Sequence, residues 1–283
     1  MKIINTPKEL SAYAKAQKDA GKSIGLVPTM GYLHDGHASL IKKSASENDV
    51  TIVSVFVNPT QFGAGEDLDS YPRDIEHDCT AAEAAGANVV FHPEPGDMYP
   101  AGYGTYVSVD SDMTKVLCGR SRPTHFRGVT TVVAKLFNIS AADRAYFGQK
   151  DAQQLAVIMR MVSDLNMGIE IIPCPIVREP DGLAMSSRNT YLSPGERTQA
   201  PVLSRSLSAA KKLIDAGERD VKTLRDEISR IISCAPDADA EYIEFRSFPS
   251  LDECGGRISG KVLIALAVRF GKTRLIDNII VNI

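Results

Sequence analysis

The chain has no long apolar run and no strong excess of charge of either sign. No segment approaches the roughly 18 apolar residues that a transmembrane helix requires, so the sequence predicts no membrane span. The 32 basic and 35 acidic residues leave a formal net charge of −3. Broad binding to nucleic acid usually needs a basic face, so this balance argues against a nucleic-acid partner. It still allows a small anionic substrate held by a few focused basic side chains.

Paired cysteines and a signal peptide are also lacking. The five cysteines lie far apart and form no C-x-x-C pair, which is typical of reduced thiols in a cytoplasmic protein. No apolar core of a secretory signal follows the first residues, and no repeat or low-complexity tract is visible. We therefore expect a cytoplasmic protein. Its 43% hydrophobic content is ample for a core, and 283 residues suffice for one large domain or two modest ones.

The first 175 residues alternate between strand-like and helix-like patterns. Short apolar runs at 24–27, 50–57, 88–91, 144–147 and 169–172 alternate with helix-like stretches at 37–47, 72–85, 129–139 and 151–165. This alternation predicts a parallel sheet covered on both faces, a Rossmann-like doubly wound α/β domain. Ligands bind such sheets at the carboxyl ends of the strands, so the loop at residues 28–37 is the expected phosphate site.

The rhythm changes after a turn signal at residues 178–182. Helix-like patterns at about 195–216 and 220–233 precede strand-like patterns at 242–245, 262–268 and 274–281. In the second helix-like stretch, one face carries Val221, Leu224, Ile228 and Ile231. Helices followed by strands predict a smaller C-terminal α+β domain. We therefore expect a Rossmann-like domain at residues 1–175 and an α+β lid domain at 176–283.

Two histidines, His34 and His37, follow the first strand-like run. If Asp35 caps the next helix, His37 lies in its first turn, where free backbone N–H groups and partial positive charge suit phosphate oxygens. The rival interpretation is a zinc site, but no nearby cysteine or H-E-x-x-H pattern completes one. The plainest alternative is two solvent-exposed loop histidines.

Polar side chains also follow the second run and precede a long apolar helix further on. Asn58 and Gln61 suit recognition of hydroxyl and carboxylate groups, although an ordinary Asn-Pro turn explains them as well. The acidic residues Glu66, Asp67, Asp69 and Asp74 either help to bind magnesium or are simply solvated. The basic side chains at residues 122–129 suit phosphate or carboxylate binding, or helix capping with ordinary surface charge.

Two later segments complete the candidate site. Lys150 lies at a helix start after the fourth strand-like run, and Gln154, one turn on, can face the same cleft. Residues 185–189 place two hydroxyls and a guanidinium between the expected domains, which makes either a movable phosphate clamp or a plain polar linker. No Ser-His-Asp pattern competes, and Cys118 lacks a partner base for a thiol nucleophile.

Together these segments resemble a known family. The sequence HDGH at 34–37 resembles the HIGH motif of the nucleotidyltransferase superfamily, and MSSR at 185–188 occupies the place of its KMSKS-like loop. The fuller match is to the AMP-forming pantoate–β-alanine ligases, the pantothenate synthetase family. The segments that resemble this family are VPTMGYLHDGH (27–37), FVNPTQF (56–62), YPR (71–73), RPTHFRGV (122–129), KLFN (135–138), GQKDAQQ (148–154), DGLAMSSRN (181–189) and LIDN (275–278).

The resemblance implies a two-step reaction. The carboxylate of pantoate attacks the α-phosphorus of ATP, which gives pantoyl adenylate and pyrophosphate; the amine of β-alanine then displaces AMP and forms pantothenate. ATP is a substrate, Mg²⁺ is expected with it, and the partners are small molecules. Similar enzymes are homodimers, and neither nucleic acid nor a membrane is implied.

The resemblance also implies residue roles. His37 is usually the proton donor of the family, and we expect His34 and His37 to donate hydrogen bonds to the phosphates. Lys150 and Arg188 neutralise phosphate charge, Gln61 and Gln154 hold pantoate, and Gln61 also contacts β-alanine. The implied ATP site comprises Met30, Gly31, Tyr32, Leu33, His34, Asp35, Gly36, His37, Gly148, Gln149, Lys150, Asp151, Val177, Met185, Ser186, Ser187 and Arg188. The magnesium ligands are not identified.

One residue departs from the family, and two other functions stay open. Gln149 stands where the family commonly has Glu, which keeps hydrogen bonding but loses the charge. The chain could instead be another HIGH-motif nucleotidyltransferase, or a nucleotide-binding sensor without turnover. Such a nucleotidyltransferase would adenylylate a phosphorylated substrate. The paired glutamines, Gln61 and Gln154, suit an uncharged, hydroxyl-rich acid better than the phosphate of that substrate. Both histidines, Lys150 and Arg188 favour turnover, since sensing needs affinity alone.

Overall fold

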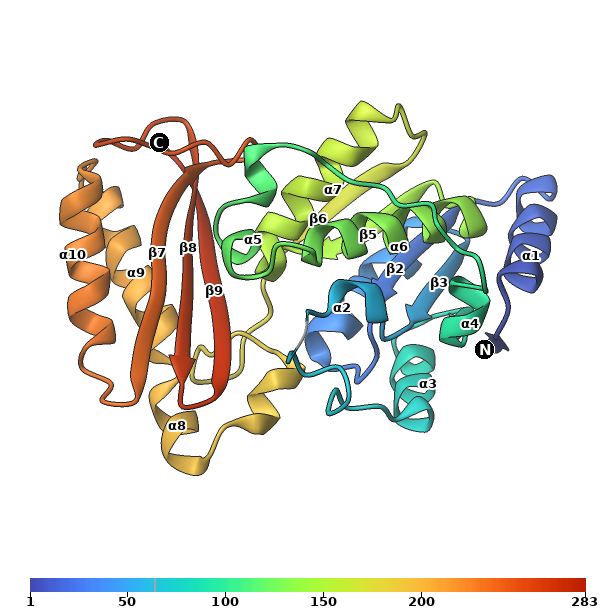
Figure 1. The fold of residues 1–283 in the computed structure, drawn as a ribbon, viewed down its shortest axis with the longest axis horizontal. Coiled ribbons are helices and arrows are strands. Elements are labelled where there is room, and N and C mark those ends of the chain that lie inside the picture. Colours follow the sequence, from blue (N-terminus) through green and yellow to red (C-terminus); the bar gives the residue numbers. More distant parts are fainter. Residues whose placement is uncertain (64) are drawn as a thin grey trace. The chain divides into compact units, whose positions relative to one another are not determined.

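The computed structural model describes residues 1–63 and 65–283, and the chain divides into two compact units (Figure 1). Unit 1 comprises Met1–Gln149 and Val157–Pro175, and unit 2 comprises Lys150–Ala156 and Ile176–Ile283. The short segment Lys150–Ala156 therefore belongs with the C-terminal residues, although it directly follows a strand of unit 1.

The elements before residue 176 are strands and helices in alternation. In chain order they are β1 (Lys2–Ile4), α1 (Pro7–Asp19), β2 (Ile24–Thr29), α2 (Asp35–Glu47), β3 (Val50–Val55), η1 (Pro59–Gln61), α3 (Ile75–Ala84), β4 (Val89–Phe91), α4 (Pro95–Met98), η2 (Asp112–Thr114), α5 (Cys118–Ser121), α6 (His125–Ser140), β5 (Arg144–Gly148), η3 (Gln149–Asp151), α7 (Ala152–Asp164) and β6 (Glu170–Cys174). Both η3 and α7 contain residues of the two units.

The six strands of unit 1 form one parallel sheet in the order β1-β4-β3-β2-β5-β6. The register pairs Val27 with Val53, Val53 with Val90, and Leu26 with Ala145. Leaving aside β1, the order β4-β3-β2-β5-β6 matches five strands, 3-2-1-4-5, of the order 3-2-1-4-5-6 of a dinucleotide-binding fold. The predicted Rossmann-like sheet is confirmed. Its strand order reverses between β2 and β5, so the carboxyl ends of these strands flank the position where such folds bind ligands.

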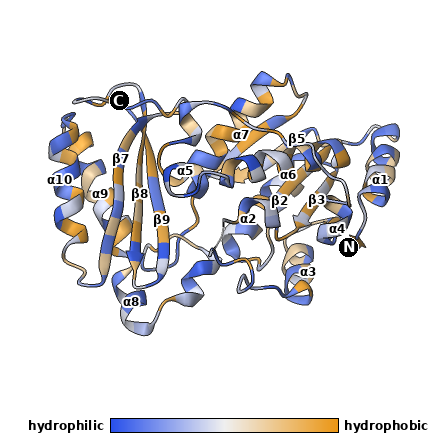
Figure 2. Cartoon of the chain, viewed as in Figure 1, coloured by the Kyte–Doolittle hydropathy of each residue, from blue (hydrophilic) through white to orange (hydrophobic). Residues whose placement is uncertain are grey.

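Helices cover both faces of this sheet. Every residue of β3 and β4 is buried, as expected for strands packed on two sides. Val27, Val53 and Val90 pack against Leu40 of α2 and Ala82 of α3, while α1 and α6 contact each other and β2. Figure 2 shows hydrophobic, orange residues along several of these strands. In the part of the chain that the structure describes, no helix is both long and apolar enough to cross a membrane.

Unit 2 contains helices followed by an antiparallel sheet. Its elements are η4 (Ser187–Tyr191), α8 (Pro194–Gln199), α9 (Val202–Asp215), α10 (Val221–Ile232), β7 (Ala238–Ser247), β8 (Lys261–Phe270) and β9 (Thr273–Asn282). The strands pair in the order β7-β8-β9. The predicted smaller α+β part is therefore confirmed.

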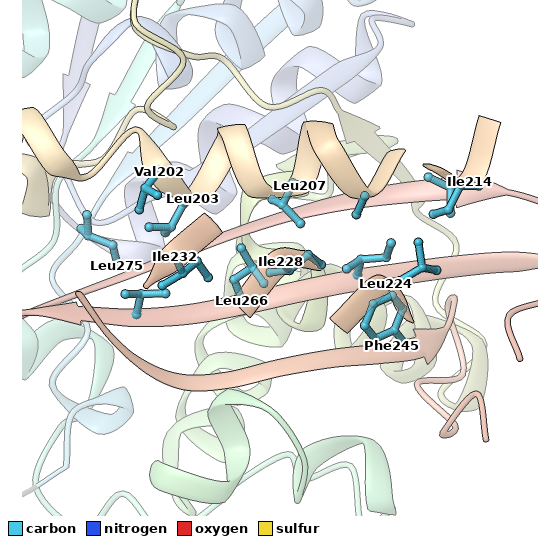
Figure 3. Close-up of a cluster of buried hydrophobic side chains, with 14 of the residues drawn as sticks. Val202, Leu203, Leu207, Ile214, Leu224, Ile228, Ile232, Phe245, Leu266 and Leu275 are labelled. Atoms are coloured by element: carbon cyan, nitrogen blue, oxygen red, sulfur yellow. The ribbon is translucent and has the colours of Figure 1, made fainter. Parts of the chain in front are cut away.

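Helices α9 and α10 bury their apolar sides against one face of this sheet (Figure 3). The expected stripe on α10 is largely correct, but Ile232 is fully buried and Ile231 only partly. The single helix expected at 195–216 is wrong, because α8 ends before Pro201 and α9 begins after it. Proline has no N–H for a helical hydrogen bond, and its ring clashes with the preceding turn, so one helix becomes two.

Candidate active site

The loop after β2 has an unusual backbone. Gly31 and Tyr32 adopt positive φ angles of 90° and 51°. Only glycine fits at position 31, because an added Cβ would lie 2.8 Å from Oδ2 of Asp78 and 3.0 Å from Cγ1 of Val55. The Thr29 hydroxyl accepts the N–H of Gly31 at 3.1 Å. The local sequence therefore forces a tight left-handed turn between the strand and the helix that follows.

A buried carboxylate holds this turn in place. Asp78 of α3 is 1% exposed, and it accepts the N–H of Tyr32 at 2.9 Å and the N–H of Leu33 at 2.7 Å. Two charge-assisted hydrogen bonds satisfy a carboxylate that would otherwise be costly to bury. These two N–H groups consequently bind the protein itself. Sequence reasoning missed Asp78, although the signal was present: it shares the helix face of Ile75 and the buried Ala82.

The two histidines cap helix α2 together. His34 is the N-cap: its Nδ1 accepts the N–H of Gly36 at 3.1 Å, and Nδ1 of His37 accepts the N–H of His34 at 3.3 Å. The expected cap, Asp35, is instead the first residue of the helix. The ring centroids are 4.1 Å apart. Since both Nδ1 atoms act as acceptors, each neutral ring carries its proton on Nε2. The pair is therefore built to present N–H donors at a helix N-terminus, where anions are favoured.

Gln61 is buried and held in one orientation by a chain of hydrogen bonds. Burial raises the pKa of Tyr99 to about 12, so its hydroxyl stays protonated and donates to Oδ1 of Asn58 at 2.7 Å. The Asn58 amide then donates to Oε1 of Gln61 at 3.0 Å and to the Gly128 carbonyl at 3.2 Å. Nε2 of Gln61 meets Sδ of Met30 at 3.0 Å. Because a thioether is a weak acceptor, this amide keeps donor strength for a better partner.

The motif RPTHFRGV supports Gln61 through contacts to its main-chain carbonyl. Nδ1 of His125 lies 2.9 Å from the Gln61 carbonyl oxygen, and Arg122 donates to the same oxygen at 3.4 Å. Gly128 allows α6 to approach closely, since an added Cβ would lie 2.6 Å from Cα of Gln61. The motif therefore holds the main chain of Gln61 in place.

Arg122 forms a two-pronged ion pair with Glu66, whose oxygens accept from Nε at 2.7 Å and from Nη2 at 2.6 Å. Partial burial would raise the pKa of Glu66, but the hydrogen bonds and charge of Arg122 bring it below the ordinary value. The carboxylate bound at this motif is therefore the protein's own. Anion binding by Arg122 and magnesium binding by Glu66 stay predictions beside this ion pair.

The carboxyl end of β5 leads into the segment that carries Lys150 and Gln154. Gly148 ends β5 and Gln149 begins η3, both in unit 1, and Lys150 is the first residue of the segment that belongs to unit 2. Nζ of Lys150 lies 3.9 Å from the half-exposed Asp151 carboxylate. This spacing leaves a loose ion pair in η3, just before α7, with a cationic side chain that is mostly, but not fully, shielded from solvent.

The segment expected as an interdomain loop is an ordered hairpin within unit 2. The Met185 N–H donates to the Val177 carbonyl at 3.0 Å, and the Glu179 N–H donates to the Leu183 carbonyl at 2.8 Å. The turn closes at Gly182, whose φ of 94° requires glycine. Val177 and Met185, both predicted for the ATP site, are thus brought together across the hairpin.

The residues after the hairpin are anchored as well. Ser186 is the N-cap of η4 and accepts the Arg188 N–H at 3.3 Å. The Asn189 amide donates back to the Glu179 carboxylate at 2.9 Å, and Arg197 of α8 pairs with the same carboxylate. These contacts order the segment in this structure, and its role as a movable phosphate clamp stays a prediction. Any movement of Arg188 should involve the hairpin and η4 together.

No cluster of three or more His, Cys, Asp or Glu side chains suited to a metal ion occurs in residues 1–63 and 65–283. The zinc interpretation concerned His34 and His37. In both rings Nδ1 already accepts a backbone N–H, so Nδ1 is not available to a metal ion.

The residues expected at the site fall into two groups. Those in unit 1 are Met30, Gly31, Tyr32, Leu33, His34, Asp35, Gly36, His37, Gln61, Gly148 and Gln149. Those in unit 2 are Lys150, Asp151, Gln154, Val177, Met185, Ser186, Ser187 and Arg188. Within each unit the structure joins Met30 to Gln61, His34 to His37, Val177 to Met185 and Ser186 to Arg188. Their roles toward substrates stay predictions.

A parallel sheet of this order, with a histidine-capped helix at its switch point, defines a Rossmann-like protein. A family model for pantoate–β-alanine ligase matches residues 2–280. The pantothenate synthetase of Acetivibrio thermocellus is 58% identical over 283 residues, which cover all of both chains. The chain belongs to the pantoate–β-alanine ligase family.

Solved structures agree with this assignment. The pantothenate synthetase from Thermus thermophilus is 42% identical, with a TM-score of 0.93 over 99% of each chain. The pantoate–β-alanine ligase from Francisella tularensis, complexed with β-γ ATP and β-alanine, is 35% identical, with a TM-score of 0.80 over 99% of this chain and 97% of that one. The likeness therefore extends over both units.

Proposed function

We infer that the protein condenses pantoate with β-alanine at the expense of ATP. The observation that carries this inference is the full-length relationship to curated pantothenate synthetases, at 58% identity. The alternatives, another HIGH-motif nucleotidyltransferase and a sensor without turnover, have no comparable support.

In the proposed first step, a carboxylate oxygen of pantoate attacks the α-phosphorus of ATP. A new bond forms between this oxygen and the α-phosphorus. The bond between the α-phosphorus and the oxygen that bridges to the β-phosphate breaks, and pyrophosphate leaves. In the second step, the amine of β-alanine attacks the acyl carbon of pantoyl adenylate. AMP leaves with the bridging oxygen, the nitrogen loses a proton, and pantothenate remains. Adenylation is needed because a free carboxylate is a poor acyl donor.

We propose that the chain contributes mainly positioning and charge neutralisation, as phosphoryl transfer requires. His34 and His37 would donate Nε2–H groups to phosphate oxygens, and Lys150 and Arg188 would neutralise the charge that develops there. Gln61 would use its amide donor for pantoate and then β-alanine, together with Gln154 for pantoate. The remaining expected ATP-site residues would surround the nucleotide.

Several expectations extend this proposal. Residues 1–175 would bind ATP and pantoate, and residues 176–283 would act as a lid. Mg²⁺ would enter with ATP, held largely by phosphate oxygens and water, since this ion needs few protein carboxylates. Family resemblance also supports a homodimer, which sedimentation at several protein concentrations would test, and the unpaired spacing of the cysteines supports a cytoplasmic location.

The reaction can be tested with the purified protein, ATP, Mg²⁺, pantoate and β-alanine. We expect AMP formation to require both co-substrates, and pyrophosphate release with pantoate alone to stop after about one turnover, because the adenylate stays bound. ATP binding without any pyrophosphate release would favour the sensor. Folded protein that makes no AMP with both co-substrates would contradict the ligase.

A further inference from the structure

The LIDN motif at 275–278 places a carboxylate where the fold expects an apolar side chain. Side chains alternate along a strand, so Asp277 shares its face of β9 with Leu275 and Val281, which belong to the hydrophobic core of unit 2. Its partner on β8 is the fully buried Leu266. Asp277 itself is 2% exposed. A charge at such a position is unfavourable unless it is fully paired.

Asp277 receives three donors that connect it to the hairpin. Arg178 donates from Nη1 at 2.7 Å and from Nη2 at 2.9 Å, and the backbone N–H of Asn278 donates at 2.8 Å. Arg178 lies on the first strand of the hairpin and also donates to the Gly182 carbonyl at 3.0 Å. The carboxylate thus fixes the hairpin from whose end residues 185–188 continue.

Asn278 fixes the other functional segment of unit 2. It is 4% exposed, and its Nδ2 donates to the main-chain carbonyl of Lys150 at 2.9 Å. The Asp277 carboxylate accepts the backbone N–H of Asn278, so these two consecutive residues are hydrogen-bonded to each other. The Lys150 side chain therefore starts from a backbone position that β9 defines.

Stability alone gives little reason for this arrangement. Buried ion pairs can often be replaced by apolar side chains without loss of stability, so they are weak evidence for a stabilising role. A fixed geometry at two segments with functional residues is a different advantage, since small misplacements slow reactions strongly.

We propose that Asp277 and Asn278 are positioning residues for the adenylation step. Asn278 sets the backbone of Lys150, and Asp277 sets, through Arg178, the hairpin that leads to Arg188. This inference rests on the proposed function, because Lys150 and Arg188 matter in it as phosphate-binding groups.

The sharpest variant is Asn278→Asp, which keeps the shape but removes the amide donor to Lys150. Asn282→Asp, the same change at an exposed position of β9, is the matched control. We expect single-turnover pyrophosphate release to fall about 10- to 100-fold in Asn278→Asp and to stay unchanged in the control. Both changes are then repeated in Lys150→Ala, with labelled ATP so that slow release is still measured.

The double variant separates positioning from general damage. If Asn278 acts through Lys150, its substitution has little further effect once that side chain is absent, so the loss shrinks at least about threefold. An equal fold-loss in both backgrounds, or near-normal release in Asn278→Asp, would overturn the proposal.

A second readout does not depend on turnover. Hydrogen exchange of the amides in Lys150–Ala156 should become faster in Asn278→Asp and remain unchanged in Asn282→Asp. If the unaltered protein releases no pyrophosphate, the proposed function fails, and exchange alone then decides whether Asn278 holds this segment. Unchanged exchange contradicts the positioning claim.

Discussion

The turn in unit 1 and the hairpin in unit 2 are both held by a buried aspartate, but in different ways. Asp78 accepts two backbone N–H groups of the turn directly. Asp277 accepts a guanidinium and reaches the hairpin through Arg178. The turn has consecutive positive φ angles and no strand partner for these N–H groups, whereas the hairpin satisfies its own backbone by cross-strand pairing.

The difference shows what each loop requires from its support. An irregular turn needs acceptors for its backbone, so loss of the carboxylate should disturb the local path of the chain. A paired hairpin keeps its shape but needs a fixed orientation on the sheet. Loss of its carboxylate should therefore shift the hairpin as a body.

The first prediction removes one expected phosphate ligand from each unit. His37→Ala and Lys150→Ala should each slow pyrophosphate release by about 10²–10³-fold, because each deletes a group that stabilises developing charge. Single-turnover kinetics measures the step directly. Lys222→Ala, at an exposed position of α10, is the control and should behave normally. A near-normal rate in one of these variants would show that the substituted side chain does not stabilise the developing charge.

The second prediction tests the turn. Asp78→Asn presents only one acceptor oxygen, so either Tyr32 or Leu33 loses its partner. We expect pyrophosphate release to fall about 10- to 100-fold and the free energy of unfolding to fall by about 1–3 kcal/mol. Urea denaturation gives the second quantity. Asp164→Asn, at an exposed ion pair, is the control; normal release in Asp78→Asn would mean that the turn holds itself.

The third prediction tests the hairpin and separates stability from rate. Asp277→Asn should lower the free energy of unfolding by about 2–3 kcal/mol, because it leaves Arg178 without its charge partner. Asp277→Asn should also slow pyrophosphate release. The double variant Asp277→Leu with Arg178→Met should recover most of the lost free energy of unfolding, but its pyrophosphate release should stay slow. Full recovery of the rate would assign the pair to stability alone.

The fourth prediction concerns the ion pair between Glu66 and Arg122, next to the backbone of Gln61, and how its contribution to stability depends on pH. The pKa of Glu66 lies below its ordinary value of 4.5 in the folded protein. Its ion pair therefore stabilises the fold above that value, and the contribution disappears as the pH falls through the lower, folded pKa. Denaturation between pH 3 and 6 should show a flatter acid limb in Glu66→Gln. Glu253→Gln, at an exposed position, should retain the full slope.

The smallest effect is expected at the departure from the family. Gln149→Glu adds a charge but keeps shape and hydrogen bonding, so the rate should change by less than about threefold. Steady-state AMP formation is sufficient to measure it. A large gain would show that a carboxylate there assists catalysis, and a large loss would show that the amide is required.

Local patterns in the sequence were enough to predict the architecture. The alternation of short apolar runs with helical stretches indicated the parallel sheet, because both signals arise from residues that pack on the same core. Strand β1 and helix α1 were missed, since β1 has three residues and α1 buries only Leu10 and Ala14. The break at Pro201 was also missed, although proline inside a helical pattern was a readable signal.

The candidate site was less predictable, because its supports are distant in the sequence. The motif residues were visible one by one, but what Arg122 and His125 bind depends on Glu66 and Gln61, which lie about sixty residues away. The same holds for Asp78 and Asp277. A buried carboxylate can be suspected from an apolar stripe, yet its partner becomes known only when the chain is folded.

The chemistry itself can be followed with pantoate labelled with ¹⁸O in its carboxylate. In the proposed reaction one carboxylate oxygen bonds to the α-phosphorus and leaves with AMP when β-alanine attacks. We therefore predict one ¹⁸O atom in the phosphate of each AMP and none in pyrophosphate, measured by mass spectrometry of a complete reaction. Unlabelled AMP formed together with pantothenate would contradict a pantoyl-adenylate intermediate, and with it the account of this site.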